Sequence, residues 1–228
     1  MPIILTLAAL VLLAILLGPQ VWVRRVLARH ATDRPDLPGT GGELARHLLD
    51  EAGLDAVKVE ITDLGDHYDP EDCAVRLLRQ HHDGRSIAAV AVAAHEVSHA
   101  VQHARGEQAF LRRFALVRKV TWVDRVASAI LLLAPIVFVF VKSPALFILQ
   151  IVAGVLLLAI RIAVHVVTLP VEFDASFAKA LPVLERGYLA PADMPAARSV
   201  LRAAAYTYVA AALATLLDVA RWLRVLRF

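Results

Sequence analysis

The chain alternates between long uncharged segments and one polar stretch. Residues 3–17, 126–141 and 143–160 carry no charge, and residues 203–217 are uncharged but rich in alanine. A helix that spans a bilayer needs about 20 mostly apolar residues. Only Lys142, next to a Ser-Pro turn signal, separates the second and third segments, which predicts a helical hairpin. We therefore expect a mainly α integral membrane protein with three to four hydrophobic helices.

This pattern predicts four parts. Residues 1–23 form an N-terminal transmembrane anchor, and residues 24–121 form a polar domain that holds most of the charged residues. Residues 122–167 form the transmembrane hairpin. Residues 168–228 contain a further helix, a hydrophobic helix and a basic tail.

The basic residues predict the orientation of the polar domain. Arg24, Arg25 and Arg29 follow the first hydrophobic segment, and Arg112 and Arg113 precede the second. Lysine and arginine are enriched in cytoplasmic loops of membrane proteins. Because both clusters flank the same polar stretch, we expect a multi-pass protein whose polar domain faces the cytoplasm.

Within the polar domain, helix and strand signals alternate. Thr40-Gly-Gly-Glu43 fits a capping box at the start of a helix. Apolar residues alternate with charged ones over residues 57–61, which predicts a strand, and residues 75–78 predict a second. Ser86 can cap a helix that runs to about Ala104 and ends at Gly106. The domain is thus expected to be helical with a small β-hairpin.

Composition narrows the class of protein. Hydrophobic residues make up 59% of the chain and charged residues 20%, against about 45–50% and about 25% in ordinary soluble domains. This composition excludes an intrinsically disordered protein, which would have low hydrophobicity and a high net charge. The single cysteine, Cys73, excludes a disulfide scaffold and has no basic neighbour in sequence that would activate it as a nucleophile. The net charge is only +3, and the sequence contains no basic run with interleaved aromatic residues. The composition therefore gives no indication of nucleic-acid binding.

The helix over residues 86–104 carries the candidate chemistry. It contains His95-Glu96-Val97-Ser98-His99, the pattern H-E-x-x-H. Residues four apart lie on one face of a helix, so His95 and His99 can bind one zinc ion. Glu96 lies beside the metal, where it can take a proton from zinc-bound water. His103 lies too far along the helix to share the ion, so we expect it in a supporting or surface position.

A catalytic zinc site needs a third protein ligand. Glu172 follows Pro170, a helix-start signal, and is expected to begin a helix that runs to about Leu181. Asp218 lies next to a hydrophobic helix, where ionisable groups are commonly functional. The residues alone favour Glu172 and leave Asp218 open.

Three segments resemble the YugP-like family of bacterial membrane zinc metallopeptidases, of the gluzincin type. They are Asp66-His-Tyr-Asp-Pro70, the helix from Ser86 to His103, and Leu169-Pro-Val-Glu-Phe-Asp-Ala-Ser176. The resemblance implies His95, His99 and Glu172 as zinc ligands and Glu96 as the base. Together with the orientation of the polar domain, this leads us to expect a membrane-anchored endopeptidase at the cytoplasmic face of the bacterial inner membrane, with the lipid bilayer as a partner. The resemblance does not supply a substrate, and we expect membrane-proximal or unfolded polypeptide segments. The family usually has glycine where Ser98 stands.

Substrate-binding groups are less well defined by the sequence. The strand Val75–Leu78 is the candidate edge strand for pairing with an extended peptide. Four residues of the hydrophobic segments are candidate donors to the attacked carbonyl: Arg161, His165, Tyr206 and Tyr208.

Two alternative functions stay open. The first is a site-2-type intramembrane metalloprotease with Asp218 as the third ligand. The second is a zinc-stabilised membrane scaffold without catalysis, although a structural zinc site has no need of Glu96.

Overall fold

The computed structural model describes residues 2–120, 143–210 and 213. The predicted segment 126–141, Asp218 and the basic tail lie outside these residues. The chain divides into two compact units, which are described separately. The first comprises Met1–Leu17, Arg112–Thr168 and Tyr208–Phe228, and the second comprises Gly18–Leu111 and Leu169–Thr207.

The first unit contains the longest stretches of helix, from α1 (Pro2–Arg29) and α6 (Pro144–Phe173). Both helices continue into the second unit. Tyr208 has polar and aromatic neighbours in this first unit. The guanidinium carbon of Arg113 lies 5.0 Å from the centroid of the Tyr208 ring, and the ring of His165 lies 5.9 Å away.

The described helices correct the predicted fold class. None of them combines enough length with enough apolar character to cross a membrane. The prediction of an integral membrane protein with three to four hydrophobic helices is therefore wrong. The helices that contain the uncharged segments 3–17 and 143–160 continue into charged residues, Arg24 in α1 and Arg161 and Glu172 in α6.

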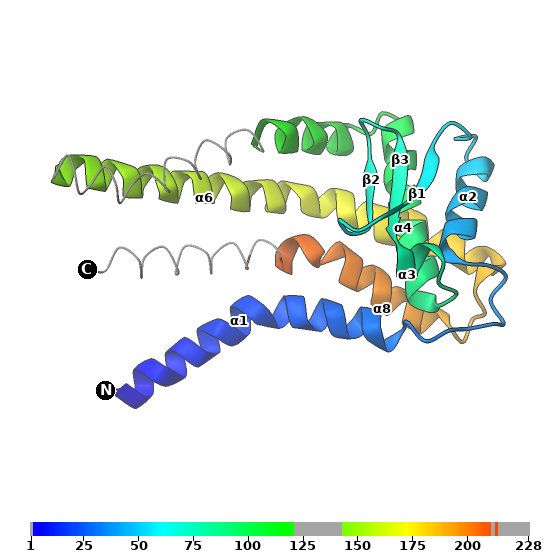
Figure 1. Ribbon diagram of the computed structural model, residues 1–228, viewed down its shortest axis with the longest axis horizontal. Coiled ribbons are helices and arrows are strands. Elements are labelled where there is room, and N and C mark those ends of the chain that lie inside the picture. The colour runs from blue at the N-terminus through cyan, green and yellow to red at the C-terminus, as the bar shows by residue number, and fades with distance from the viewer. Residues whose placement is uncertain (1, 121–142, 211–212, 214–228) are drawn as a thin grey trace. The chain divides into compact units, whose positions relative to one another are not determined.

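The second unit is built around α4 (Ile87–Ala104), which is buried along nearly its whole length. The predicted boundaries of this helix are confirmed. The side chain of Ser86 accepts a hydrogen bond from the amide of Ala89 at 3.1 Å, and Gly106 follows the helix with a φ of +63°. Alanine occupies many positions of α4, so its neighbours approach closely. Figure 1 shows the strands gathered near α4 together with α2 (Gly41–Glu51) and α3 (Arg79–His82).

Helix α2 begins as predicted. Thr40 Oγ1 accepts from the amide of Glu43 at 3.2 Å, and Glu43 Oε2 accepts from the amide of Thr40 at 2.8 Å. The first residue of the helix, Gly41, lies against α3 and α4. A Cβ atom there would come within 2.2 Å of the carbonyl oxygen of His81. Glycine therefore allows the start of α2 to pack against the helix that carries the histidines.

The strands form a mixed sheet in the order β1-β3-β2. β1 (Lys58–Thr62) pairs in parallel with β3 (Ala74–Leu78), and β2 (His67–Asp69) pairs antiparallel with β3. The two predicted strands, β1 and β3, are both present, but they pair in parallel and so do not form the predicted β-hairpin. β3 is the central strand, so the prediction that Val75–Leu78 is the edge strand for a peptide is wrong. Residues between the two predicted strands form β2 and take up one edge of β3.

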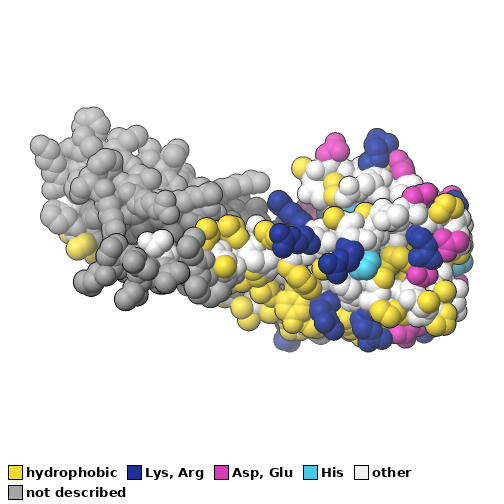
Figure 2. Space-filling view, turned by 90° about the horizontal axis from the view of Figure 1, so that it is seen from below, with side chains coloured by type: hydrophobic (Ala, Val, Ile, Leu, Met, Phe, Trp, Pro, Cys, Tyr) yellow, Lys and Arg dark blue, Asp and Glu magenta, His cyan; other side chains and the backbone are white. Residues whose placement is uncertain are grey.

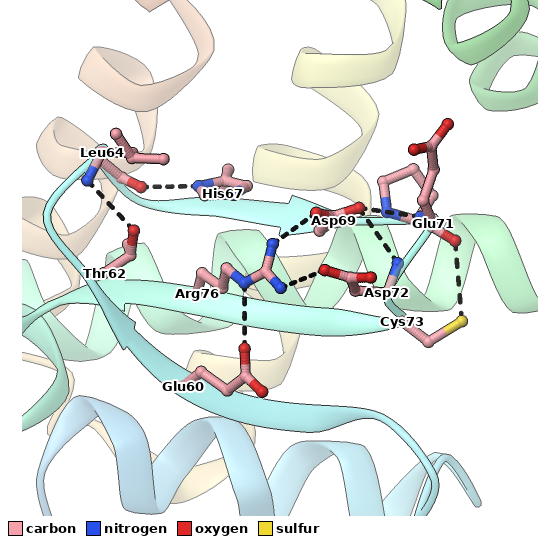
Figure 3. A network of polar contacts seen from close by, with 11 residues as sticks. Glu60, Thr62, Leu64, His67, Asp69, Glu71, Asp72, Cys73 and Arg76 are labelled. Carbon is pink, nitrogen blue, oxygen red and sulfur yellow. Dashed lines mark hydrogen bonds and ion pairs between the residues drawn. The ribbon is translucent and has the colours of Figure 1, made fainter.

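Arg76 connects all three strands on one face of the sheet (Figure 3). Its guanidinium group contacts Glu60 of β1 at 3.1 Å, Asp69 of β2 at 2.5 Å, and Asp72 in the following turn. Asp69 also accepts hydrogen bonds from the amides of Glu71 and Asp72. Figure 2 shows basic and acidic side chains on the visible face of the described part, with hydrophobic ones between them.

The C-terminal part of the second unit returns to α4. The end of α6 leads into the π-helix η1 (Asp174–Ala180) and then into α7 (Leu181–Val183), η2 (Leu184–Tyr188) and α8 (Met194–Ala205). Both η1 and α8 pack against α4. Glu172 lies near the end of α6, with Pro170 inside the helix. The prediction that a helix begins at Glu172 is therefore wrong.

Candidate metal centre

His95 and His99 lie one turn apart on α4 and face the same side. Their ring centroids are 4.7 Å apart, with the ring planes nearly perpendicular at 79°. Both side chains are buried, with 4% and 6% exposure. The spacing of four residues places them as the sequence predicts.

Glu172 approaches the two histidines from the end of α6. Its Oε2 atom lies 3.1 Å from Nε2 of His95 and 3.4 Å from Nε2 of His99. One ligand atom from each residue lies within 4.8 Å of the other two. The structure thus brings together the three residues that the sequence and the resemblance named. Among the described residues, this is the group of histidine and acidic side chains that could hold a metal ion.

Glu96, the candidate base, also lies on α4 and is 7% exposed. It directly follows His95 in the buried part of the helix. Asp218, the other candidate for the third ligand, lies outside the described residues.

Electrostatics favour the ionised form of Glu172. Burial alone raises the pKa of its carboxyl, but the charge of His99 and hydrogen bonds from His95 and His99 outweigh this effect. The pKa of Glu172 therefore lies well below its usual range. A carboxylate in a buried position needs positive charge or strong donors beside it.

Two further residues contact the outer nitrogens of the histidines. Oε1 of Gln102 lies 2.8 Å from Nδ1 of His99, and Oγ of Ser176 lies 3.0 Å from Nδ1 of His95. Both side chains are buried. Neither residue was predicted from the sequence. Gln102 stands three residues after His99, so helical spacing could have placed it on the same face.

Gln102 is in turn held by the C-terminal segment. Its Nε2 donates to the carbonyl of Val171 at 3.0 Å and to Asp174 Oδ2 at 2.7 Å. Lys179 forms an ion pair with Asp174 and another with Glu107, at 3.0 Å. Burial raises the pKa of Asp174, but hydrogen bonds from Lys179 and Gln102 outweigh this and lower it.

The donor set fits a zinc ion. Two imidazole nitrogens and a carboxylate oxygen converge on one point, and these are ligands that zinc prefers. Two histidines with one glutamate form a ligand set of catalytic zinc sites, which keep a fourth position for water or substrate. The buried, anionic Glu172 supplies charge that a cation would balance.

The other candidates lie elsewhere. His103 accepts or donates a hydrogen bond at Nδ1 with the hydroxyl of Tyr68, 2.9 Å away, and its ring stacks on Phe110. It supports the end of α4, as the sequence suggested. Cys73 is exposed, with its thiol near the carbonyl of Pro70.

The candidate donors to the attacked carbonyl are divided between the units. The ring of Tyr206 packs against those of Trp22 and Phe173 in the second unit. Arg161, His165 and Tyr208 belong to the first. The role of these four residues stays a prediction.

Comparison with known proteins identifies the family. The model of a family described as "Putative neutral zinc metallopeptidase" matches residues 4–227. The chain belongs to this family. It is also 36% identical over 189 residues to "Putative membrane protease YugP" of Bacillus subtilis (strain 168). The aligned region covers 82% of this chain and 80% of that relative. No solved structure gives a significant match. Zinc is the metal of this metallopeptidase family, and His95, His99 and Glu172 form the group that fits it.

Proposed function

We propose that the protein is a zinc-dependent endopeptidase in which His95, His99 and Glu172 bind the metal and Glu96 is the general base. The observation that carries this proposal is the convergence of three buried ligand atoms within 4.8 Å. Two come from α4 and the third from a residue 77 positions beyond His95. A helix that merely contained incidental histidines would have no reason to bury a carboxylate between them.

The chemistry follows from the arrangement of the side chains. A zinc ion bound here supplies Lewis acidity, which polarises a peptide carbonyl and lowers the pKa of water towards 7. Glu96, next to His95 on the same helix, accepts the proton of the attacking water. Its carboxyl then returns that proton to the amine of the leaving peptide, so one residue is first base and then acid. Burial of Glu96 excludes bulk water from this exchange.

We further propose that the substrate is a polypeptide close to a membrane surface on the cytoplasmic side. The Bacillus subtilis relative carries the name of a membrane protease. In this chain, Arg24, Arg25 and Arg29 are exposed near the end of α1. Basic clusters are attracted to the anionic lipids of the cytoplasmic leaflet. Binding of the purified protein to vesicles should therefore need phosphatidylserine and weaken as salt is raised. Equal binding to pure phosphatidylcholine would contradict this part of the proposal.

Replacement of Glu96 tests the catalytic role. Glu96→Gln should leave the zinc content unchanged and lower the rate of casein cleavage by about 10²–10⁴-fold, because a general base contributes about that much. Zinc would be measured by elemental analysis of the same sample. Glu185→Gln is a matched control, since Glu185 is an exposed partner of Arg198, and it should cleave casein at the wild-type rate.

The result also distinguishes a non-catalytic zinc scaffold. If wild-type protein holds zinc but Glu96→Gln cleaves as fast as wild type, Glu96 is not the base and the proposed mechanism is wrong. If zinc-loaded wild type cleaves no peptide bond in any substrate tested, the scaffold interpretation replaces the peptidase.

A further inference from the structure

The contacts of Gln102 determine which way its amide points. Its Nε2 faces two groups that can only accept, the carbonyl of Val171 and the carboxylate of Asp174. The amide NH₂ group must therefore lie on that side, and Oε1 must face His99. Since Oε1 can only accept, Nδ1 of His99, 2.8 Å away, must carry a hydrogen. The neutral ring of His99 then has its lone pair on Nε2.

The contacts of Ser176 lead to the same result for His95. The hydroxyl of Ser176 has one hydrogen, and it donates this hydrogen to the carbonyl of Leu201 at 3.0 Å. Its oxygen can then only accept from Nδ1 of His95, 3.0 Å away. The hydrogen of His95 is thus also on Nδ1. Both rings present Nε2 to Glu172, at 3.1 Å and 3.4 Å.

The π-helix η1 explains how one segment reaches both rings. Its hydrogen bonds join residues five apart, so such residues lie in line along the helix. Lys179 is five residues after Asp174 and forms an ion pair with it. That contact holds the Asp174 carboxylate towards Gln102. Ser176, in the same π-helix, reaches His95 directly. Short π-helical turns are frequent at functional sites.

From these contacts we infer that Gln102 and Ser176 are positioning residues that fix both ligand histidines in the tautomer with Nε2 free for the metal. Asp174 and Lys179 act one step further out by holding the amide of Gln102. The segment from Glu172 to Lys179 therefore supplies a ligand and also sets the tautomer of both other ligands. This inference rests on the ligand assignment of the proposed function.

Zinc affinity and histidine tautomers test the inference in the full-length protein. The zinc-free protein is titrated with zinc in competition with a chromogenic chelator. Gln102→Leu and Ser176→Ala should each weaken zinc binding by about 10–100-fold, the usual effect of losing an outer-shell partner. Nitrogen-15 NMR of the zinc-free protein, at a pH where the rings are neutral, should show both rings with hydrogen on Nδ1 in wild type. A mixture of tautomers is expected for His99 in Gln102→Leu and for His95 in Ser176→Ala.

Ser98→Ala is the matched control. Ser98 is also a buried serine of the second unit, and its hydroxyl donates to the carbonyl of Ala94 at 2.7 Å without contact to a ligand nitrogen. Its loss should leave zinc affinity and both tautomers unchanged. Because Ser176→Ala removes a single oxygen, it keeps the test valid even if Gln102→Leu does not fold.

Three results would overturn the inference. The first is zinc affinity within about threefold of wild type in Ser176→Ala, and the second is an equal loss of affinity in Ser98→Ala and Ser176→Ala. The third is a neutral ring of either histidine, in zinc-free wild type, with its hydrogen on Nε2 in place of Nδ1. None of these measurements uses peptide cleavage. A protein that shows the expected affinities and tautomers but cleaves no peptide would refute the peptidase proposal and leave the positioning roles in place.

Discussion

Two polar clusters of the second unit use similar side chains in opposite environments. On the sheet, Arg76 contacts Glu60, Asp69 and Asp72, and the side-chain exposures of these residues range from 24% to 59%. At the metal centre, His95, His99 and Glu172 are exposed by no more than 6%. The first cluster is a surface feature, and the second is enclosed by helices.

The difference in burial separates structural from chemical roles. An ion pair in contact with water contributes little, because water already solvates both charges. Taking charges out of water costs several kcal/mol per ion, and good pairing only offsets this cost. The exposed cluster on the sheet therefore costs little free energy, and joining the three strands is a sufficient role for it. Burying Glu172 between the two histidines costs folding free energy unless a bound cation balances its charge. Buried groups with a perturbed pKa, such as this carboxyl, mark candidate functional sites.

The clusters also differ in how far they reach along the chain. Arg76 and its partners lie within 16 residues of one another. His95 and Glu172 are separated by 77 residues. The surface cluster is thus formed by neighbouring strands, whereas the metal centre exists only when the C-terminal segment has packed on α4.

The largest effect is expected when the buried carboxylate is removed. Glu172→Ala deletes one of the three proposed zinc ligands. Zinc affinity should therefore fall further than for Gln102→Leu or Ser176→Ala, where a loss of about 10–100-fold is expected. Peptide cleavage should fall to background. Elemental analysis and the chelator competition measure the first effect. Glu60→Ala removes a carboxylate from the sheet cluster and should keep full zinc affinity. If Glu172→Ala retains zinc, Asp218 becomes the candidate third ligand.

Removal of the metal should destabilise the protein next most strongly. A ligand present at 1,000 times its dissociation constant stabilises the folded state by about 4.1 kcal/mol. A chelator should therefore lower the melting temperature of wild-type protein clearly, and added zinc should restore it. In Glu172→Ala neither treatment should change the melting temperature. An unchanged melting temperature in chelated wild type would mean that zinc is not bound to the folded state.

Local signals were sufficient for the helix that carries the site. Ser86 and Gly106 bound α4 as predicted, and the box of Thr40 and Glu43 starts α2. The H-E-x-x-H spacing alone places His95 and His99 on one face, because helical geometry is fixed over four residues. The roles of these residues and of Glu96 stay predictions until they are tested.

The features that were not predicted depend on packing between segments far apart in the sequence. The strand order was not predicted because β2 was not recognised: a strand of only three residues gives a weak signal in the sequence. Without β2, nothing in the sequence indicated that β1 and β3 pair in parallel. Pro170 suggested a helix start, but α6 continues through it to Phe173. The uncharged segments were taken as membrane spans, but no described helix is both long and apolar enough to cross a membrane. The contacts of Ser176 follow from a π-helix, which no sequence period indicated.

A smaller effect is expected at the exposed cluster. Arg76→Leu removes ion pairs to three carboxylates but keeps most of the apolar length of the side chain. The melting temperature should fall by only a few degrees, because exposed pairs contribute little. Zinc affinity should equal that of wild type. A fall in zinc affinity with Arg76→Leu would show that the sheet cluster and the metal centre are coupled, and the contrast between them would fail.

The smallest effect is the acid dependence of the same pair. Burial raises the pKa of Asp69, but amide hydrogen bonds from Glu71 and Asp72 and the charge of Arg76 outweigh it and lower the pKa. A carboxyl whose pKa is lowered by folding adds stability that is full above its unfolded pKa of about 3.9 and is lost as pH falls through the folded value.

In zinc-free protein, the difference in urea midpoint between wild type and Arg76→Leu should therefore be largest near about pH 6 and narrow towards about pH 3. Zinc-free samples avoid the loss of metal that protonation of the histidines would cause. A difference that stays constant over this range would mean that Arg76 stabilises the sheet through packing of its methylene groups rather than through its charge.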